Sequence, residues 1–380
     1  MMPSFRSCKK ASISLMALLF VAGLLVGGMV IFFITINEID ALNDKVVALQ
    51  SQLSTLQVSQ NVTYQNITIY QNENTLADIY SNLRGSIVLV QGTTSDGAVQ
   101  GSGFVYFYSD RHVVITNYHV VHDTSSLSVT FSNGNGYSAE ILGTDPYADL
   151  AVLSVDDAPQ SEFKPVEIVS SATLRVGESV IAIGNPYGLV GSLTTGVVSA
   201  LGRTITEDYA GGFSIANIIQ TSTPINPGNS GGPLLNAVGN VVGITTAIVS
   251  DSQGLGFAIP SNTILREISA LIATGTYSGH SYLGVTGQDM SYELAQQMDS
   301  IVTYGWRIAT VVGGGPSAGS LRPDDIVIAL NGSTIRNNDD LASYLEEKTL
   351  PGERLNMTLV RDNQTIDVTV VLGTRPSPST

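Results

Sequence analysis

The segment Gly-Asn-Ser-Gly-Gly-Pro at residues 228–233 places a serine hydroxyl between glycines that can leave their backbone N–H groups facing one small space. Acyl transfer needs a serine activated by a neighbouring imidazole. It also needs preformed donors for the negative charge that develops on the attacked carbonyl oxygen. Ser230 is therefore the candidate nucleophile.

The same segment also fits Gly-x-Ser-x-Gly, a nucleophile elbow that requires a strand before the serine, a helix after it and the chain order serine, acid, histidine. Pro233 and the apolar run at 241–249 instead predict a turn that leads into a β-strand. The one histidine after Ser230 is His280, in a glycine-flanked loop without surroundings that resemble a site. The pattern disfavours the elbow, and a purely structural glycine-rich turn is the remaining alternative for the segment on its own.

Two upstream residues fit the other roles of a catalytic triad. His119 lies in the strand-like apolar run 113–121 and is the natural general base. Asp149 directly precedes the apolar run 150–153, where its carboxylate can fix the imidazole tautomer. The competitors for these two roles are His112, His122 and Asp145. The chain order histidine, aspartate, serine is that of the chymotrypsin arrangement.

The chain resembles the HtrA (Deg) family of trypsin-like serine proteases that carry a PDZ domain. Its characteristic segments stand here in one order, beginning with Gly-Ser-Gly-Phe-Val and ending with Gly-Phe-Ala-Ile-Pro. They lie at residues 101–105, 115–121, 149–152, 183–188, 196–200, 225–234 and 256–260. The resemblance covers about Leu76 to Gly373.

The resemblance implies a role for each matching residue. His119 would be the general base, Asp149 its orienting partner and Ser230 the nucleophile. The oxyanion hole would consist of the backbone N–H groups of Gly228 and Ser230, with Asn229 between them.

Substrate preference can be argued from the same stretch. No carboxylate occurs between Asp208 and Asp251, so a pocket around the nucleophile has no anion for an Arg or Lys side chain. The resemblance implies that Ile225 and Ile248 line the first specificity pocket, which leaves room for Val, Ala or Leu. Such a pocket discriminates weakly, by roughly 1 to 3 kcal/mol per methylene.

Length and composition predict a mostly β protein. The 380 residues suggest two to three domains, and 38 glycines accompany many short branched runs. The resemblance implies a chymotrypsin-like double six-stranded β-barrel over residues 76–273. A helix at 264–272, after Pro260-Ser261-Asn262, is expected to be capped and to close this domain.

The glycine-rich segment 274–279 opens a region, 274–373, that resembles a PDZ domain. Tyr282-Leu283-Gly284-Val285 matches its carboxylate-binding loop, and Asn331-Gly332 predicts a hairpin turn. A helix at 339–348 would flank a groove in which a peptide adds as a strand and its terminal carboxylate meets backbone N–H groups. The alternative is a small β-rich domain used only for assembly. A Pro-rich tail, 374–380, follows.

Residues 11–37 form a segment without charged side chains. This segment is longer than the about 20 residues that span a bilayer as a helix. A cleavable signal peptide has an apolar core of only about 7 to 15 residues, so a retained anchor is expected. Basic residues precede the segment and acidic residues follow it, so residues 1–10 should stay cytosolic and the remaining domains should lie outside the cytoplasm. Cys8 is the only cysteine, so no disulfide forms within the chain.

Residues 38–75 are expected to form a helical stalk and a polar linker. Apolar residues recur at alternating spacings of three and four, which is a heptad seam of under three repeats. They are Ile39, Leu42, Val46, Leu49, Leu53 and Leu56. A three-stranded stalk, suggested by resemblance to trimers, and a simple amphipathic spacer helix are both open interpretations. Sequons at Asn61 and Asn66 are compatible with a flexible, glycosylated linker.

The net charge of −15 disfavours nucleic acid and anionic lipid as partners. No cofactor is expected, because no cluster has metal-ligand spacing and no phosphate-binding motif is present. The hypothesis is a membrane-anchored, ATP-independent serine endopeptidase that cuts misfolded or unfolded proteins outside the cytoplasm and binds C-terminal peptides at its PDZ domain. The alternative is a regulatory, site-specific protease or a chaperone with little general proteolysis.

Overall fold

The computed structural model describes residues 29, 45–46, 75–95, 97–185, 191–206, 214–226, 228–246 and 255–377. The chain divides into two compact units, Met1–Glu73 and Asn74–Thr380. In the first unit Met29, Lys45 and Val46 are described, and all three are helical. Apart from Met29 and Val46, the expected anchor, heptad seam and sequons lie outside the described residues. Within the described part of the chain, no helix is long and apolar enough to cross a bilayer.

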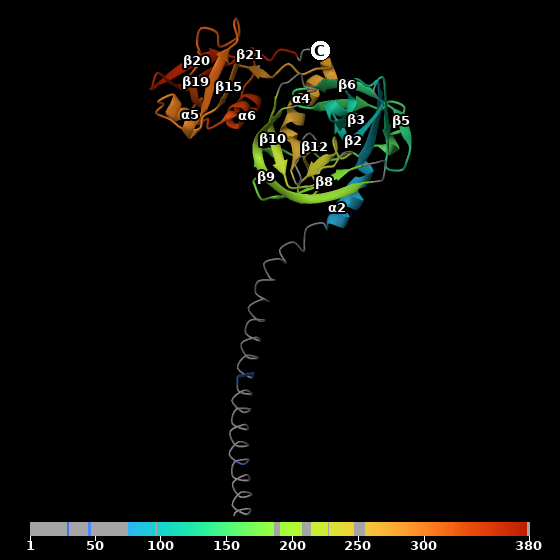
Figure 1. Ribbon diagram of the computed structural model, residues 1–380. Helices are drawn as coiled ribbons and strands as arrows, with labels where there is room; N and C mark the ends of the chain where they lie inside the picture. The colour runs from blue at the N-terminus through green and yellow to red at the C-terminus, as the bar shows by residue number, and fades with distance from the viewer. Residues whose placement is uncertain are drawn as a thin grey trace, which may run out of the picture. The chain divides into compact units, whose positions relative to one another are not determined.

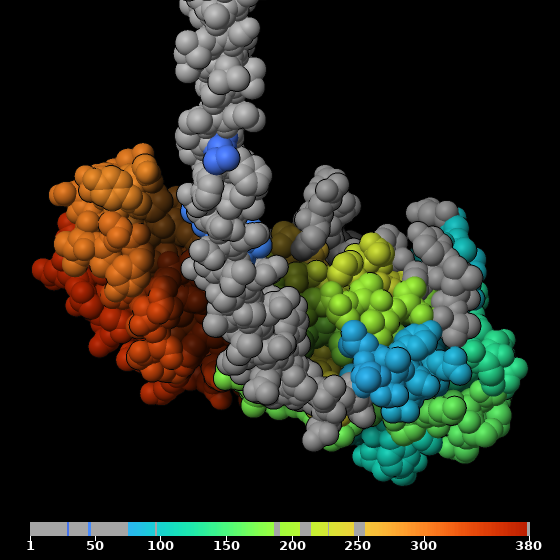
Figure 2. All heavy atoms as spheres, turned by 90° about the horizontal axis from the view of Figure 1, so that it is seen from below, coloured from blue at the N-terminus to red at the C-terminus, as the bar shows by residue number. Residues whose placement is uncertain are grey.

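The second unit begins with a short helix, α2 (Leu76–Leu83), that the sequence did not single out. Thr75 caps it, since its side chain accepts from the backbone N–H of Asp78 and the Asp78 carboxylate accepts from the Thr75 backbone N–H. Figure 2 shows α2 in blue on the surface of the barrels that follow. The Tyr80 hydroxyl donates to the carbonyl of Gly191 at 2.8 Å and so ties this helix to the second barrel.

The first barrel is a seven-stranded sheet in the order β5-β4-β1-β2-β3-β7-β6 (Figure 1). Its strands are β1 (Ile87–Thr94), β2 (Gly97–Tyr108), β3 (Arg111–Thr116), β4 (Ser126–Thr130), β5 (Gly136–Ser138), β6 (Glu140–Asp145) and β7 (Leu150–Ser154). The two end strands, β5 and β6, are separated only by Ala139, whose N–H donates to Leu127 O at 3.0 Å. β5 and β6 are therefore two halves of one strand that bends at Ala139, which gives the expected six strands. The first half pairs with β4 and the second half with β7, so this strand joins the two edges of the sheet into a barrel.

The second barrel is closed by hydrogen bonds in the order β10-β13-β12-β11-β8-β9, which is the expected six strands. Its strands are β8 (Ser179–Gly184), β9 (Ser192–Thr206), β10 (Ser214–Thr221), β11 (Pro233–Leu235), β12 (Val241–Thr246) and β13 (Gly256–Pro260). Single turns of helix connect strands at α3 (Tyr118–Val121), η3 (Gln160–Glu162) and η4 (Ser171–Thr173), and another, η2 (Arg84–Ser86), leads from α2 into β1.

Strands of the barrels are apolar on both faces because each face meets a different core. In β3, Val113 and Ile115 lie in a core shared by both barrels, whereas Val114 lies in a core of the first barrel alone. Successive side chains of a strand point to opposite sides, so this segregation follows from the period of two.

Helix α4 (Ser261–Thr274) is longer than the expected 264–272 and has no side-chain cap, since its N-cap residue is Pro260. Ser261 instead donates to the carbonyl of Val169 at 2.6 Å. Gly275 ends the helix in the left-handed conformation, with φ of 80°. The buried stripe of α4 consists of Ser261, Thr263, Ile264, Glu267, Ile268 and Leu271. A glutamate therefore lies on the face that packs into the core.

The C-terminal domain contains a sheet in the order β15-β16-β17-β19-β20, with β15 at one edge. Its elements are β14 (Ser281–Tyr282), β15 (Val285–Asp289), α5 (Tyr292–Gln297), β16 (Trp306–Val311), β17 (Ile326–Leu330), β18 (Ser333–Thr334), α6 (Asn338–Lys348), β19 (Arg354–Arg361), β20 (Gln364–Val371) and β21 (Gly373–Thr374). The predicted hairpin turn at Asn331-Gly332 is confirmed, because it joins β17 to β18 with positive φ at both residues.

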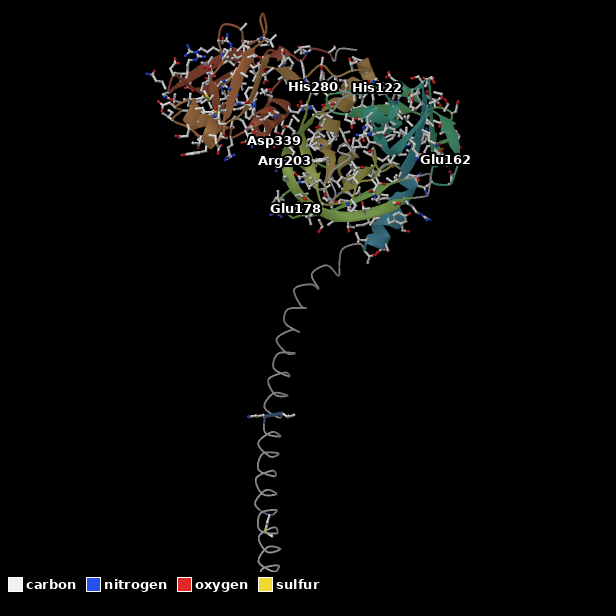
Figure 3. The ribbon with its side chains drawn as sticks, viewed as in Figure 1. His122, Glu162, Glu178, Arg203, His280 and Asp339 are labelled. Carbon is white, nitrogen blue, oxygen red and sulfur yellow. The ribbon has the colours of Figure 1, made fainter. Side chains whose placement is uncertain are left out.

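Helix α6 contacts β9 of the second barrel (Figure 3). The Asp339 carboxylate accepts from Arg203 Nη1 at 3.0 Å and from the backbone N–H of Thr204 at 2.8 Å. One turn further along α6, the hydroxyl of Ser343 donates to Gly202 O at 3.0 Å. The same helix thus flanks the C-terminal sheet and touches the barrel.

Candidate functional site

Three segments from different parts of the barrels carry the predicted catalytic residues. His119 lies in α3, the single helical turn after β3. Asp149 ends the tight turn between β6 and β7, and Ser230 lies in the loop between β10 and β11. His119 thus follows the end of β3 and Asp149 directly precedes β7, whereas Ser230 lies in the loop that leads into β11.

The structure brings His119 and Asp149 into direct contact. The His119 Nδ1 atom lies 2.9 Å from Asp149 Oδ2 and 3.1 Å from Oδ1, and the backbone N–H of His119 donates to Oδ1 at 3.0 Å. A carboxylate only accepts, so Nδ1 carries the hydrogen and Nε2 is left as the basic nitrogen. The Asp149 side chain is fully buried and that of His119 is 24% exposed. This pair has the form of a general base with its orienting acid.

Further partners hold the Asp149 carboxylate in place. The Thr246 hydroxyl, at the end of β12, donates to Asp149 Oδ2 at 3.0 Å. The side-chain amide of Asn117 donates to the carbonyl of Asp149 at 2.9 Å. Asp149 has φ of 49°, a left-handed conformation that aspartate and asparagine tolerate better than most residues. The second barrel therefore contributes to the orientation of an acid that belongs to the first.

The Ser230 loop is bonded to both barrels. The backbone N–H of Ser102 donates to Ser230 O at 2.7 Å. The carbonyl of Ser102 accepts from the hydroxyl of Thr116 at 2.7 Å, and Thr116 lies three residues before His119 in the sequence. Gly231 has φ of 86°, and a Cβ there would lie 2.0 Å from Ser102 O. Only glycine fits this close approach, so the Ser230 loop packs directly on β2 at Ser102 and on the Thr116 side chain at the end of β3.

The backbone around Gly228 fits a tight turn before Ser230. Gly228 has φ of 97°, and its carbonyl accepts from the Ser102 hydroxyl at 2.6 Å. The backbone N–H of Asn229 donates to Asn226 O at 2.9 Å, so it is used inside the turn. Of the residues expected at the oxyanion hole, this leaves Gly228 and Ser230 as candidate donors, with Asn229 as the residue that shapes the turn.

Only one of the two residues expected in the specificity pocket is described. Ile225 is partly buried against the core of the second barrel, and its Cγ1 lies 2.7 Å from the position that a Cβ on Gly256 would take. Ile248 lies outside the described residues.

The competitors for the catalytic roles have other partners. His112 stacks on Phe163 with ring centroids 5.0 Å apart. His122 lies 3.1 Å from Asp123. Asp145 contacts His280, whose surroundings are thus richer in charge than its glycine-flanked position in the sequence suggests.

The predicted carboxylate loop borders a groove of about 420 Å³ between β15 and α6. All four residues expected there line it, namely Tyr282, Leu283, Gly284 and Val285. Gly284 has φ of 73°, and Leu283 O accepts from the Ser317 hydroxyl at 2.6 Å, so the loop is held from its inner side. Apolar residues of α6, including Leu341 and Leu345, form the opposite wall.

Four residues that support the site were not selected as site residues from the sequence. Ser102, Thr116 and Asn117 lie inside motifs already noted, so their position in those motifs was the available signal. Thr246 had no comparable signal, because its contact with Asp149 spans 97 residues of sequence.

Comparison with known proteins identifies the family of each domain. A family model described as "Trypsin-like peptidase domain" matches residues 101–244, and one described as "PDZ domain" matches residues 281–372. The chain is 40% identical to the "Probable periplasmic serine endoprotease DegP-like" of Chlamydia trachomatis serovar D, over 74% of this chain and 55% of that protein. It is 34% identical to "Protease Do-like 1, chloroplastic" of Arabidopsis thaliana, over 74% and 65% of the two chains. The chain thus spans little more than half the length of the first of these relatives.

Solved structures match over a larger share. The HtrA-type protease AlgW with tripeptide is 31% identical with a TM-score of 0.65, and the match covers 80% of this chain and 98% of that one. The serine endoprotease from Yersinia pestis is 28% identical with a TM-score of 0.57, over 78% and 97%. The chain belongs to the HtrA-type trypsin-like serine proteases that carry a PDZ domain.

Proposed function

We propose that this protein is an ATP-independent serine endopeptidase that degrades misfolded or unfolded proteins outside the cytoplasm. The observation that carries the proposal is the buried Asp149 carboxylate bonded to His119 Nδ1, in a site where the Ser230 carbonyl accepts from the backbone N–H of Ser102 on β2. In the proposed mechanism, His119 Nε2 takes the proton of the Ser230 hydroxyl as the oxygen attacks the peptide carbonyl. The same nitrogen then donates that proton to the leaving amine, and a water molecule hydrolyses the acyl-enzyme.

The proposed substrate preference is for small or medium aliphatic residues before the cut. Ile225 offers an apolar wall, and no carboxylate occurs in the sequence between Asp208 and Asp251 to bind a cationic side chain. Because an apolar pocket discriminates weakly, exposure of apolar segments in an unfolded chain would select substrates more than sequence does.

The cleavage pattern tests this proposal. We expect the purified full chain to cut a reduced, carboxymethylated model protein at many positions, mostly after Val, Ala or Leu, and to leave the folded form of the same protein intact. Mapping the new termini by mass spectrometry gives the result directly. Cuts after Arg or Lys would contradict the pocket assignment, and one or two cuts in an otherwise intact unfolded chain would favour a regulatory, site-specific protease.

We further propose that the groove between β15 and α6 binds the C-terminus of a peptide. β15 is an edge strand, so a peptide can add to the sheet beside it, and the loop of Leu283 to Val285 stands where the terminal carboxylate would end. The solved relatives named as AlgW with tripeptide and with decapeptide support peptide binding in this family.

A bulky side chain in the groove should block this binding. Ala342 lines the groove on α6, and we expect Ala342→Phe to weaken the binding of a fluorescent peptide with an apolar C-terminus by at least about tenfold, or ~1.4 kcal/mol. The matched control is Ala309→Phe, which adds the same ring at an exposed position of β16 away from the groove. Fluorescence anisotropy measures both, and equal affinity of the free and C-terminally amidated peptides would contradict the carboxylate loop.

We also propose that residues 11–37 form a membrane anchor with the protease and PDZ domains on the extracytoplasmic side, and that the chain assembles as a homotrimer. The uncharged segment supports the anchor, and the periplasmic location named for the Chlamydia relative supports the extracytoplasmic side. Resistance to carbonate extraction from membranes tests the anchor. Sedimentation of the detergent-solubilised full chain tests the trimer.

A further inference from the structure

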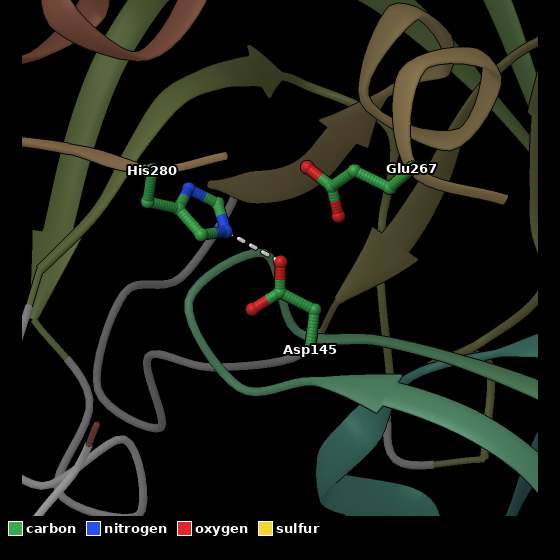
Figure 4. A group of neighbouring side chains, drawn as sticks. All are labelled: Asp145, Glu267 and His280. Carbon is green, nitrogen blue, oxygen red and sulfur yellow. Dashed lines mark hydrogen bonds and ion pairs between the residues drawn. The ribbon is translucent and has the colours of Figure 1, made fainter. Parts of the chain in front are cut away.

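A second cluster of ionisable side chains consists of Asp145, Glu267 and His280 (Figure 4). Asp145 ends β6, Glu267 lies on the buried stripe of α4, and His280 follows that helix just before β14. All three residues are buried, and one ligand atom from each lies within 4.8 Å of the other two. The cluster therefore joins three segments that are distant in the sequence.

The Glu267 carboxylate is the unusual member of this cluster. Its side chain is fully buried, and Oε1 accepts from Arg266 Nη2 at 2.6 Å. Oε2 has no hydrogen-bond partner among the described residues, and Figure 4 shows the carboxylate directed toward Asp145 and His280. A buried polar atom without a partner is costly, which points to a missing cation or donor at this position.

His280 is oriented as a metal-binding histidine is. Its Nδ1 lies 3.0 Å from Glu346 Oε2, while Nε2 lies 2.5 Å from Asp145 Oδ2. A histidine that binds a metal through one nitrogen commonly donates the other N–H to a carboxylate, which fixes the ring. Glu346 fills that second role here, so the hydrogen on Nε2, which now lies against Asp145 Oδ2, is the one that a cation would replace.

We propose that Asp145, Glu267 and His280 bind one divalent cation of the zinc type. One imidazole nitrogen and two carboxylate oxygens suit Zn²⁺, whereas Ca²⁺ and Mg²⁺ prefer oxygen ligands alone. The cation takes the place of the hydrogen on His280 Nε2, and that proton leaves to solvent. The three protein ligands leave one tetrahedral position for water.

The proposed site differs in purpose from the catalytic one. It links the end of β6, helix α4 and the segment that enters the C-terminal domain, so the cation stabilises the junction rather than a reacting group. Arg266 contacts both Glu267 and Glu346 at the edge of the cluster. It balances part of the negative charge there but does not reach Glu267 Oε2.

Zinc binding to the purified, chelator-treated full chain tests the proposal. We expect about one Zn²⁺ per chain, held against a competing chromophoric chelator of about micromolar affinity. Because the His119–Asp149 pair can also attract zinc, the titration is repeated with His119→Ala, which should keep that ion. Glu267→Gln and His280→Gln should each weaken binding by at least about tenfold.

Matched controls separate metal binding from damage to the fold. Glu267→Gln keeps the side-chain shape and an oxygen for Arg266, and Glu178→Gln makes the same change at an exposed ion pair with Arg175. Zn²⁺ should raise the Tm of the wild type and of Glu178→Gln, but not that of Glu267→Gln. If a cluster variant fails to fold, the visible spectrum of Co²⁺ bound to the wild type decides, since a tetrahedral site absorbs strongly. Any one of four results would overturn the proposal. The wild type could bind no Zn²⁺, or the ion could be lost in His119→Ala. The Co²⁺ spectrum could be that of an octahedral site, or folded Glu267→Gln could bind zinc with unchanged affinity.

Discussion

Replacement of Ser230 by alanine is expected to reduce kcat for cleavage of an unfolded protein or an aliphatic peptide by about 10⁴- to 10⁶-fold. The hydroxyl is the proposed attacking group, so the acyl-enzyme cannot form by the proposed route without it. The side chain makes up little of the substrate-binding surface, so KM should change little. Initial rates are measured with a fluorogenic peptide that has Val or Ala directly before its leaving group. They give both kcat and KM.

The control for this variant is Ser125→Ala, which removes a hydroxyl that donates to Thr93 O on the exposed rim of the first barrel. Its kcat should stay within about twofold of the wild type, because surface substitutions of this kind are close to neutral. Circular dichroism of both variants checks that the barrels fold. Cleavage that survives in folded Ser230→Ala would remove Ser230 from the mechanism.

The proposed catalytic residues were predictable because each role demands a particular chemistry. A serine between glycines, with a histidine and an aspartate in the order of the chymotrypsin arrangement, narrows the choice to a few residues on sequence grounds alone. The three-dimensional contacts then choose among the competitors. Asp149 rather than Asp145 meets the His119 ring, because the turn between β6 and β7 points only the later aspartate toward α3.

The supporting residues were less predictable because their contacts are long-range. Thr246 is an ordinary threonine at the end of an apolar strand, and it becomes part of the site only because the second barrel closes beside the first. The bend at Ala139 is similar, since no proline or glycine marks it and only the pairing of β5 with β4 and of β6 with β7 reveals it.

The buried cluster of Asp145, Glu267 and His280 could not be found from spacing. Metal motifs that are visible in sequence place their ligands a few residues apart, whereas Asp145 and His280 are separated by 135 residues. Glu267 lies on the apolar stripe of α4, where a carboxylate contradicts the pattern of the helix. A charged residue at a core position is a local inconsistency of the kind that often marks a functional site.

Replacement of Asp149 by asparagine is expected to lower kcat by about 10⁴-fold while the protein stays folded. Asparagine tolerates the left-handed backbone of this residue, with φ of 49°. The backbone N–H of His119 donates to Oδ1, so the single carbonyl oxygen of asparagine should take that position. The amide NH₂ then faces His119 Nδ1, which must become the acceptor. The hydrogen moves to Nε2, and the nitrogen that should remove the Ser230 proton no longer can.

Asp123→Asn is a closely matched control for this substitution. Asp123 also has positive φ, 56°, and also lies beside a histidine Nδ1, that of His122 at 3.1 Å, but its side chain is 80% exposed. Its kcat should stay within about twofold of the wild type, since exposed ion pairs contribute little. Steady-state kinetics on the same fluorogenic peptide compare the two variants. If Asp149→Asn kept kcat within about tenfold of the wild type, the tautomer of His119 would not depend on this carboxylate. The buried contact at 2.9 Å would then be structural rather than catalytic.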